Sequence, residues 1–167
     1  MTSLLKICIF FTILFSALVT GLLYGYSCSV NIGLSALPDD QYLRAMQSIN
    51  NAILNPYFFI SFIGLVLLFP ITTWLQYLRS RNYKFYYLLI ATVIYLAGVF
   101  GVTMLGNVPL NNALANFKIS LSGVTEITVQ RNHFETPWNQ FHVVRTIASI
   151  VSFSLTIISV LKNNFNK

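Results

Sequence analysis

The sequence predicts an all-α protein, a four-helix transmembrane bundle with short interfacial helices on its outer face. Of its 167 residues, 56% are hydrophobic and only 8% are charged, whereas soluble domains carry roughly 25% charged residues. Four apolar runs are long enough to cross a bilayer, which takes about 20 helical residues. The expected spans are 5–32, 57–78, 85–106 and 141–161. No internal repeat divides the chain, so residues 1–167 are expected to form a single integral-membrane domain.

The first apolar run contains no charged residue between Ile7 and Pro38. A signal peptide has an apolar centre of only about 7–15 residues, so this run is expected to span the membrane. Small residues recur along it at every fourth position: Ala17, Gly21, Gly25, Ser29 and Gly33. That spacing lets another helix approach closely. The other helix belongs either to the same chain or to a second copy, in a homodimer through Gly21 and Gly25.

Between the first two runs, the sequence predicts a short interfacial helix. Asp39 and Asp40 follow a proline, and negative charge is favourable at a helix N-terminus. One face of this helix is apolar and carries Tyr42, Met46, Ile49 and Ile53. Next, Asn55–Pro56 predicts an N-cap with proline in the first turn of the second span.

The distribution of lysine and arginine predicts the orientation, because cytoplasmic loops are rich in both. One side of the membrane would hold Lys6, Arg79, Arg81, Lys84, Lys162 and Lys167. The other side would hold Arg44, Lys118 and Arg131 together with all four acidic residues. The richer side is expected to be cytoplasmic, which places both termini inside. The net charge of +6 is scattered around apolar runs, so no nucleic-acid partner is expected.

Two polar stripes interrupt the apolar runs at the predicted outer face. The first lies in 103–112 and contains Asn107, Asn111 and Asn112. Carboxamides are costly beside hydrocarbon unless they find partners. The second stripe places polar side chains on one helical face at spacings of 4, 3 and 4, with Arg145 beside them: Glu135, Asn139, His142 and Thr146. We expect the two stripes to meet at one membrane face and to form the site.

Several alternatives remain open for the second stripe. Arg145 either extends to the headgroups or pairs inward with Glu135 and His142, because a charge at the start of a span is costly when unpaired. His142 is either a base oriented by Glu135 or a hydrogen-bonded structural histidine. The stretch 118–136 alternates like a strand, but its apolar spacing favours a helix from about Thr125.

The segments 107–114 and 131–146 resemble the signature blocks of the anthrone-oxygenase-like family of small membrane proteins. The segments 46–51 and 55–56 resemble a third block. The resemblance implies a four-span bundle in a bacterial inner membrane. It also implies oxygenation of tricyclic anthrones to anthraquinones without metal or flavin, so the expected cofactor is none. The implied partners are the lipid bilayer, a small hydrophobic aromatic ligand and dioxygen.

That chemistry needs a base, an apolar pocket and donors to an oxyanion. We expect His142 to be the base and Arg145 with Asn107 or Asn111 to be donors. We expect Trp138 and Phe134 to stack on a flat ring. The candidate catalytic residues are His142, Arg145 and Glu135, and the candidate substrate-binding residues are Asn107, Asn111, Trp138, Asn139, Phe134 and Asn50.

Other functions have less support in the sequence. The sequence has no GxGxxG, Walker, HExxH or CxxCH motif. A metal site from His133, Glu135 and His142 is disfavoured because His133 and Glu135 face different sides of a helix. A transporter is disfavoured because Arg145 is nearly the only ionisable residue in the spans. The remaining alternative is a non-catalytic binding or scaffold protein whose polar cluster is structural.

Overall fold

The computed structural model describes residues 3–162 and is helical, with no strand among those residues. Four of its helices are long and apolar enough to cross a membrane: Ser3–Ser35, Pro56–Arg79, Tyr83–Asn116 and Val124–Leu161. The predicted all-α, four-helix transmembrane fold is therefore confirmed, and the protein is a multi-pass membrane protein. Lys167, used above for orientation, lies outside the described residues.

All four membrane-spanning helices, which we call rods, are longer than the predicted spans, and the third and fourth differ most. The third continues past Pro109 to Asn116 instead of ending near 106. The fourth begins at Val124, which confirms the helix expected from about Thr125 and shows that the strand alternative is wrong. In chain order, the elements are α1 (Ser3–Gly25), η1 (Tyr26–Val30), α2 (Asn31–Ser35), α3 (Asp39–Ala52), α4 (Pro56–Arg79), α5 (Tyr83–Ile94), η2 (Tyr95–Gly101), η3 (Thr103–Asn107), α6 (Val108–Asn116), η4 (Ile119–Leu121) and α7 (Val124–Leu161).

The predicted start signals of α3 and α4 lie where the helices begin. Asp39 and Asp40 occupy the first turn of α3. The side chain of Asn55 caps α4 by accepting a hydrogen bond from the backbone N–H of Phe58 at 3.1 Å. Three segments, η1, η2 and η3, are π-helical, a conformation that is rare and frequent at functional sites.

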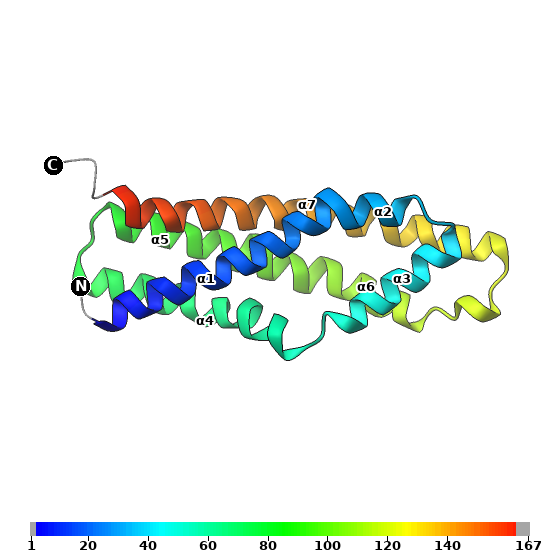
Figure 1. Cartoon of the computed structure of the whole chain (residues 1–167), viewed down its shortest axis with the longest axis horizontal. Helices are drawn as coiled ribbons and strands as arrows, with labels where there is room; N and C mark the ends of the chain where they lie inside the picture. Colours follow the sequence, from blue (N-terminus) through cyan, green and yellow to red (C-terminus); the bar gives the residue numbers. More distant parts are fainter. Residues whose placement is uncertain (1–2, 163–167) are drawn as a thin grey trace.

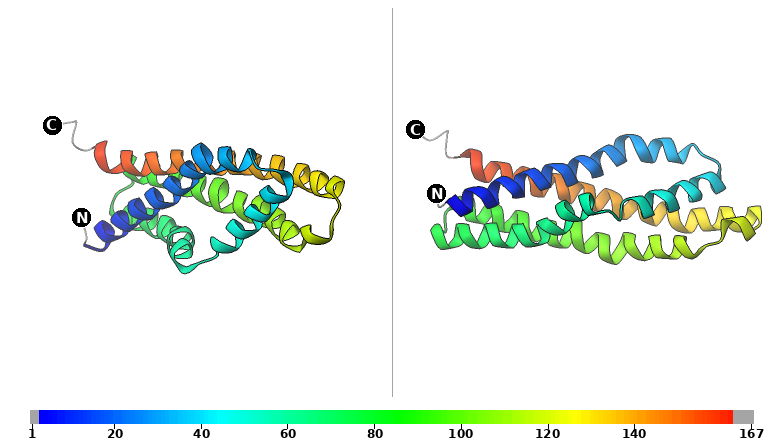
Figure 2. Two further views of the ribbon diagram at one scale, coloured as in Figure 1. Left: turned by 45° about the vertical axis from the view of Figure 1, so that its right-hand side comes forward. Right: turned by 60° about the horizontal axis from the view of Figure 1, so that its bottom comes forward.

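The bundle has a membrane-sized part and an extension beyond it. Figure 1 shows the N-terminus, the α4–α5 turn and the end of α7 at one end of the molecule, whereas α2 and the start of α7 lie at the other. Helix α4 has 24 residues, or about 36 Å, enough for a hydrocarbon core of about 30 Å. A count of 24 residues along each of the other three rods, begun at the end of the bundle where α4 ends, reaches Tyr26, Gly106 and Trp138. We call the part beyond this level the cap; α3 covers one side of it (Figure 2).

Each part has its own core. Within the spans, a cluster around Leu65, Phe69 and Tyr95 joins α1, α4 and the third rod. Between spans, the hydroxyl groups of Thr12 and Thr72 bond at 2.9 Å. The cap has a second cluster: Tyr42, Leu43, Met46, Leu114, Ile119, Phe134 and Trp138. The cap is therefore a packed unit that covers one end of the bundle.

Glycines bring the third rod close to α7. A Cβ added to Gly98 would lie 2.7 Å from the Cβ of Ala148, and one added to Gly106 would lie 2.6 Å from the ring of Phe141. In contrast, a Cβ added to any of the three glycines of the first-span stripe would meet no atom within 4 Å. That stripe faces away from the bundle, so the alternative in which it packs against another helix of the same chain is wrong.

We predict that Gly98→Ala lowers the free energy of unfolding by about 1–3 kcal/mol, the usual cost of inserting atoms into a well-packed contact. Thermal unfolding in a mild detergent measures the change. Gly33→Ala is the matched control; it adds the same methyl group to open space and should cost nothing. Equal melting temperatures for wild type and Gly98→Ala would contradict the close approach of these rods.

Candidate functional site

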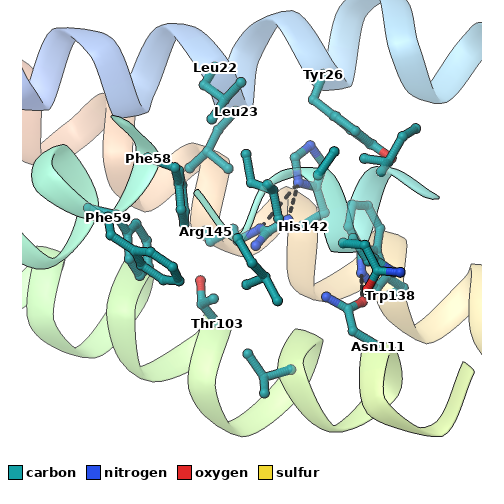
Figure 3. A pocket seen from close by; sticks show the side chains of 18 of the residues that line it. Leu22, Leu23, Tyr26, Phe58, Phe59, Thr103, Asn111, Trp138, His142 and Arg145 are labelled. Atoms are coloured by element: carbon teal, nitrogen blue, oxygen red, sulfur yellow. Dashed lines mark hydrogen bonds between the residues drawn. The ribbon is translucent and has the colours of Figure 1, made fainter. Parts of the chain in front are cut away.

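A cavity of about 500 Å³ lies where the spans meet the cap. Its size falls within the roughly 300–1,000 Å³ of small-molecule sites, which are typically apolar with a few polar groups. It is lined by η1, the end of α3, the start of α4, the third rod and α7. Figure 3 shows Phe58 and Phe59 on one side of it, Thr103 on another, and Arg145, His142 and Trp138 along α7.

The edge of the cavity is apolar and exposed. Leu54, Met104 and Ile63 line the cavity and are 64%, 44% and 40% exposed. Ile63 lies in a span, two turns into α4, and Leu54 lies just before that helix begins. The cavity therefore borders the surface of the bundle that faces lipid.

The two polar stripes meet at Trp138, as predicted. The Nδ2 of Asn107 donates to the backbone carbonyl of Trp138 at 3.1 Å. The indole Nε1 donates to Oδ1 of Asn111 at 2.8 Å (Figure 3). Trp138 is thus hydrogen-bonded to the carboxamides of both asparagines. The close approach of Gly106 to α7 makes these short bonds possible.

His142 is fully buried and uses both ring nitrogens. Nε and Nη2 of Arg145 lie 3.2 and 3.1 Å from its Nδ1. A guanidinium has only donors, so Nδ1 accepts and a neutral imidazole carries its hydrogen on Nε2. That nitrogen lies 2.9 Å from Oγ of Ser27, whose own hydrogen goes to the carbonyl of Leu23. The contacts therefore define one tautomer of His142.

Arg145 has no acidic partner within the described residues. Its guanidinium turns back over the Trp138 ring, 5.1 Å from the centroid, and bonds His142 instead of extending to the headgroups. Glu135 pairs with Arg131 at 2.7 Å, so the expected pairing of Glu135 with His142 and Arg145 is wrong. Seven residues separate Glu135 from His142, a rise of about 10 Å, whereas Arg131 is one turn away.

Five of the nine predicted site residues line the cavity: Asn50, Asn111, Trp138, His142 and Arg145. The other four do not. Asn107 is fully buried between two helices, and Asn139 accepts a bond from Asn31 at 3.0 Å. Phe134 belongs to the cap core, and Glu135 to the ion pair with Arg131. These four side chains hold the cap and the rods together around the cavity.

Several lining residues were not predicted. Tyr26 lies edge-on to His142, with ring centroids 5.2 Å apart, and donates its hydroxyl to the sulfur of Met46 at 3.1 Å. Gln47, Phe58 and Phe59 also line the cavity. The sequence signal that could have found Tyr26 is the polar interruption of the first apolar run that begins at this residue. In the structure, the π-helical segment η1 begins at the same residue.

Arg131 fastens the cap. It donates to the carbonyls of Ser35 and Leu37 at 3.0 and 2.7 Å and to Asp39 at 2.9 Å. Thr128 donates to the same carboxylate at 2.6 Å. The Thr128 bond, followed by the Arg131 bond, lowers the pKa of Asp39 below its ordinary value. Burial raises the pKa of Tyr42, over which the Arg131 guanidinium lies.

Among the described residues, no group of three histidine, cysteine, aspartate or glutamate side chains is placed to hold a metal ion. The possible donors are dispersed. His133 is exposed, His142 is buried at the cavity, and Glu135 is held by Arg131.

Fold and site together define a multi-pass helical membrane protein with an apolar cavity of ligand size at one end of its spans. Residues 45–155 match the family model of the anthrone oxygenases. That match covers more than half of the chain, so the chain belongs to the anthrone oxygenase family. No curated protein and no solved structure matches it.

The lowered pKa of Asp39 gives a pH prediction. A carboxyl whose pKa is lower in the folded state stabilises fully above its unfolded pKa of about 3.9, and this stabilisation disappears as the pH falls through the folded pKa. Asp39→Asn should therefore lower the melting temperature at pH 7, and the difference from wild type should shrink below about pH 4.

Detergent melts between pH 7 and pH 3 measure this difference. Asp40→Asn is the control, because Asp40 forms only an exposed pair with Arg44 at 4.0 Å, and such pairs contribute little. A difference between wild type and Asp39→Asn that stays constant down to pH 3 would exclude the proposed role of this carboxylate.

Proposed function

We propose that the protein is a cofactor-independent oxygenase acting on a lipophilic aromatic substrate inside the cavity. The observation that carries the proposal is Arg145, a guanidinium at an apolar cavity with a neutral imidazole beside it and, within residues 3–162, no carboxylate partner. Buried charges are costly unless paired, and a reaction that forms a negative oxygen would supply the missing partner. Membership of the anthrone oxygenase family gives the reaction class.

The reaction balances without a cofactor. The ring carbon opposite the carbonyl of an anthrone is acidic, because loss of its proton gives an aromatic anion. The anion reacts with dioxygen to form a carbon–oxygen bond, and loss of water from the peroxide leaves a second carbonyl. One anthrone and one dioxygen thus give one anthraquinone and one water. The protein has to supply a base and hydrogen-bond donors.

His142 would be the base through Nδ1. In the resting arrangement Arg145 covers this nitrogen, while Ser27 accepts from Nε2 and keeps Nδ1 free of hydrogen. When a substrate binds and the guanidinium turns away from Nδ1, this nitrogen becomes free to take the proton of the acidic carbon. The turned guanidinium would face the place where the anion reacts with dioxygen and a negative oxygen forms. Arg145 would then stabilise the oxygen with charge-assisted hydrogen bonds, which are the stronger kind.

The apolar walls would hold the ring system. Trp138, Phe58 and Phe59 line the cavity, and aromatic side chains bind flat rings by stacking. The exposed apolar edge at Leu54 and Ile63 would admit a substrate from the bilayer. Asn107, Asn139, Phe134 and Glu135 would act indirectly, by holding the helices that carry the lining residues.

A scaffold role is the second candidate. The observation that favours it is that both ring nitrogens of the fully buried His142 are bonded within the chain. In that case the polar cluster would lock η1 to α7 and have no reactive role. The two candidates differ in whether His142 affects anything besides stability.

We further propose a bacterial inner-membrane location with the cap outside and both termini cytoplasmic. The reason is that cytoplasmic loops are rich in lysine and arginine, and the side opposite the cap has more of both. A topology reporter fused after Lys167 or inserted at Arg81 should then behave as cytoplasmic. One inserted near Thr125 should behave as periplasmic. Cytoplasmic behaviour at Thr125 would reverse the orientation and place the cavity at the inner face.

A homodimer through Gly21 and Gly25 is also proposed, because this small-residue stripe faces away from the bundle and such stripes suit close helix contacts. Gly21→Leu should convert a dimer in nanodiscs or detergent to a monomer, measured by light scattering. Wild-type protein that is already monomeric at all concentrations would exclude the dimer.

We predict that His142→Ala keeps the fold and lowers oxygenation by about a hundred- to ten-thousand-fold, the typical contribution of a general base. The assay supplies a simple anthrone and isotopically labelled dioxygen to membranes that contain the protein, and it measures label in the quinone. His133→Ala is the matched control, because His133 is exposed and lies outside the cavity.

Anthrones oxidise spontaneously, so rates are compared with membranes that lack the protein. Equal activity of wild type and His142→Ala would exclude His142 as the base. Absence of protein-dependent label across anthrones, phenols and quinols would favour the scaffold role instead.

A further inference from the structure

One wall of the cavity consists of carboxamides from two distant segments. Gln47, Asn50 and Asn51 come from α3, and Asn111 and Asn112 come from α6. Gln47 ties the two helices together, because its Nε2 donates to the carbonyls of Leu114 and Phe117 at 2.8 and 3.0 Å. The wall is therefore a fixed feature of the cap.

The hydrogen bonds of this wall leave donors unused. Nδ2 of Asn50 is buried and has no acceptor among the described residues. Asn111 accepts from Trp138 through Oδ1, and its own Nδ2 forms no bond with the described residues. A buried donor without an acceptor is costly, so Nδ2 of Asn50 is suited to an oxygen of a ligand. Nδ2 of Asn111, which is not fully buried, is a second unused donor of this wall.

The charge of the wall limits which oxygen it suits. Arg145 is the one charged side chain that lines the cavity within residues 3–162, and the wall itself is neutral. Trp138 separates the two donor groups, because the guanidinium lies over its ring face while Asn111 is bonded at its Nε1 edge (Figure 3). The cavity thus offers a charged donor and a neutral donor group at different sides of one rigid ring.

We propose that Asn50 and Asn111 form a second subsite that binds a neutral carbonyl oxygen of the ligand. The preferred ligand is a flat ring system with acceptor oxygens on two opposite edges, one at Asn50 and Asn111 and the other at Arg145. This inference deepens the proposed function and rests on it for the reaction. The substrate carbonyl would lie at the carboxamide wall, which directs the opposite, acidic carbon towards His142.

Three unreactive tricyclic ligands test the subsite by binding alone. Anthraquinone has two opposite carbonyls, xanthone has one, and anthracene has none. The chain has two tryptophans, so Trp74→Phe leaves Trp138, which contacts both donor groups, as the single fluorophore. Quenching of Trp138 in nanodiscs should give affinities in the order anthraquinone, xanthone, anthracene.

Asn50→Leu should lower the affinity for anthraquinone by about tenfold, as expected for loss of one good hydrogen bond, and bring it to that for xanthone. Arg145→Met should do the same, while the double variant should bind all three ligands equally. Neither single variant should change the affinity for anthracene. Asn116→Leu is the control, because Asn116 is exposed and does not line the cavity.

Equal anthraquinone affinity in wild type and Asn50→Leu would overturn the subsite, as would a loss of anthracene binding in that variant. Asn50→Ala repeats the comparison if Asn50→Leu does not fold. Since none of the ligands reacts, the outcome is independent of catalysis. Binding at both ends, without protein-dependent incorporation of labelled dioxygen into any anthrone, phenol or quinol, would exclude the proposed reaction and leave the subsite standing.

Discussion

The contact between Arg145 and the buried His142 is the interaction on which the site depends. A guanidinium at the level of the spans needs a partner, and here it has an imidazole instead of a carboxylate. Together with the bond from Nε2 to Ser27, this contact fixes the tautomer of His142. It also holds the arginine over Trp138. A neutral partner leaves the positive charge uncompensated, which suits a cavity that is to receive a negative oxygen.

The rest of the fold holds that contact at one depth. Gly98 and Gly106 let the third rod approach α7 closely, so Asn107 and Asn111 reach the same tryptophan. The cap then covers the ends of the rods; Arg131 fastens α7 to the start of α3, and Gln47, at the cavity, fastens α3 to the end of α6. Fastening and reaction chemistry are therefore separated along α7, with the four acidic residues in or next to the cap.

The sequence predicted the helices and the meeting of the two stripes, because apolar length and polar interruptions depend on local composition. It did not predict which polar side chains enter the cavity. Glu135 shared a helical face with His142, but Arg131, one turn away, is the nearer partner. Asn107 and Asn111 are one turn apart, yet only Asn111 lines the cavity, since Asn107 lies against α7. The outward direction of the glycine stripe depends on packing that no local pattern contains.

The central claim is that Arg145 and His142 are kept for function and not for stability. The most direct measurement is the unfolding free energy of the double variant Arg145→Leu/His142→Leu, alongside its oxygenase activity. Replacing both members of a buried polar pair by apolar groups is often neutral or stabilising, so we predict unchanged or higher stability together with lost activity. A loss of several kcal/mol in stability would contradict the claim and assign the pair a structural role.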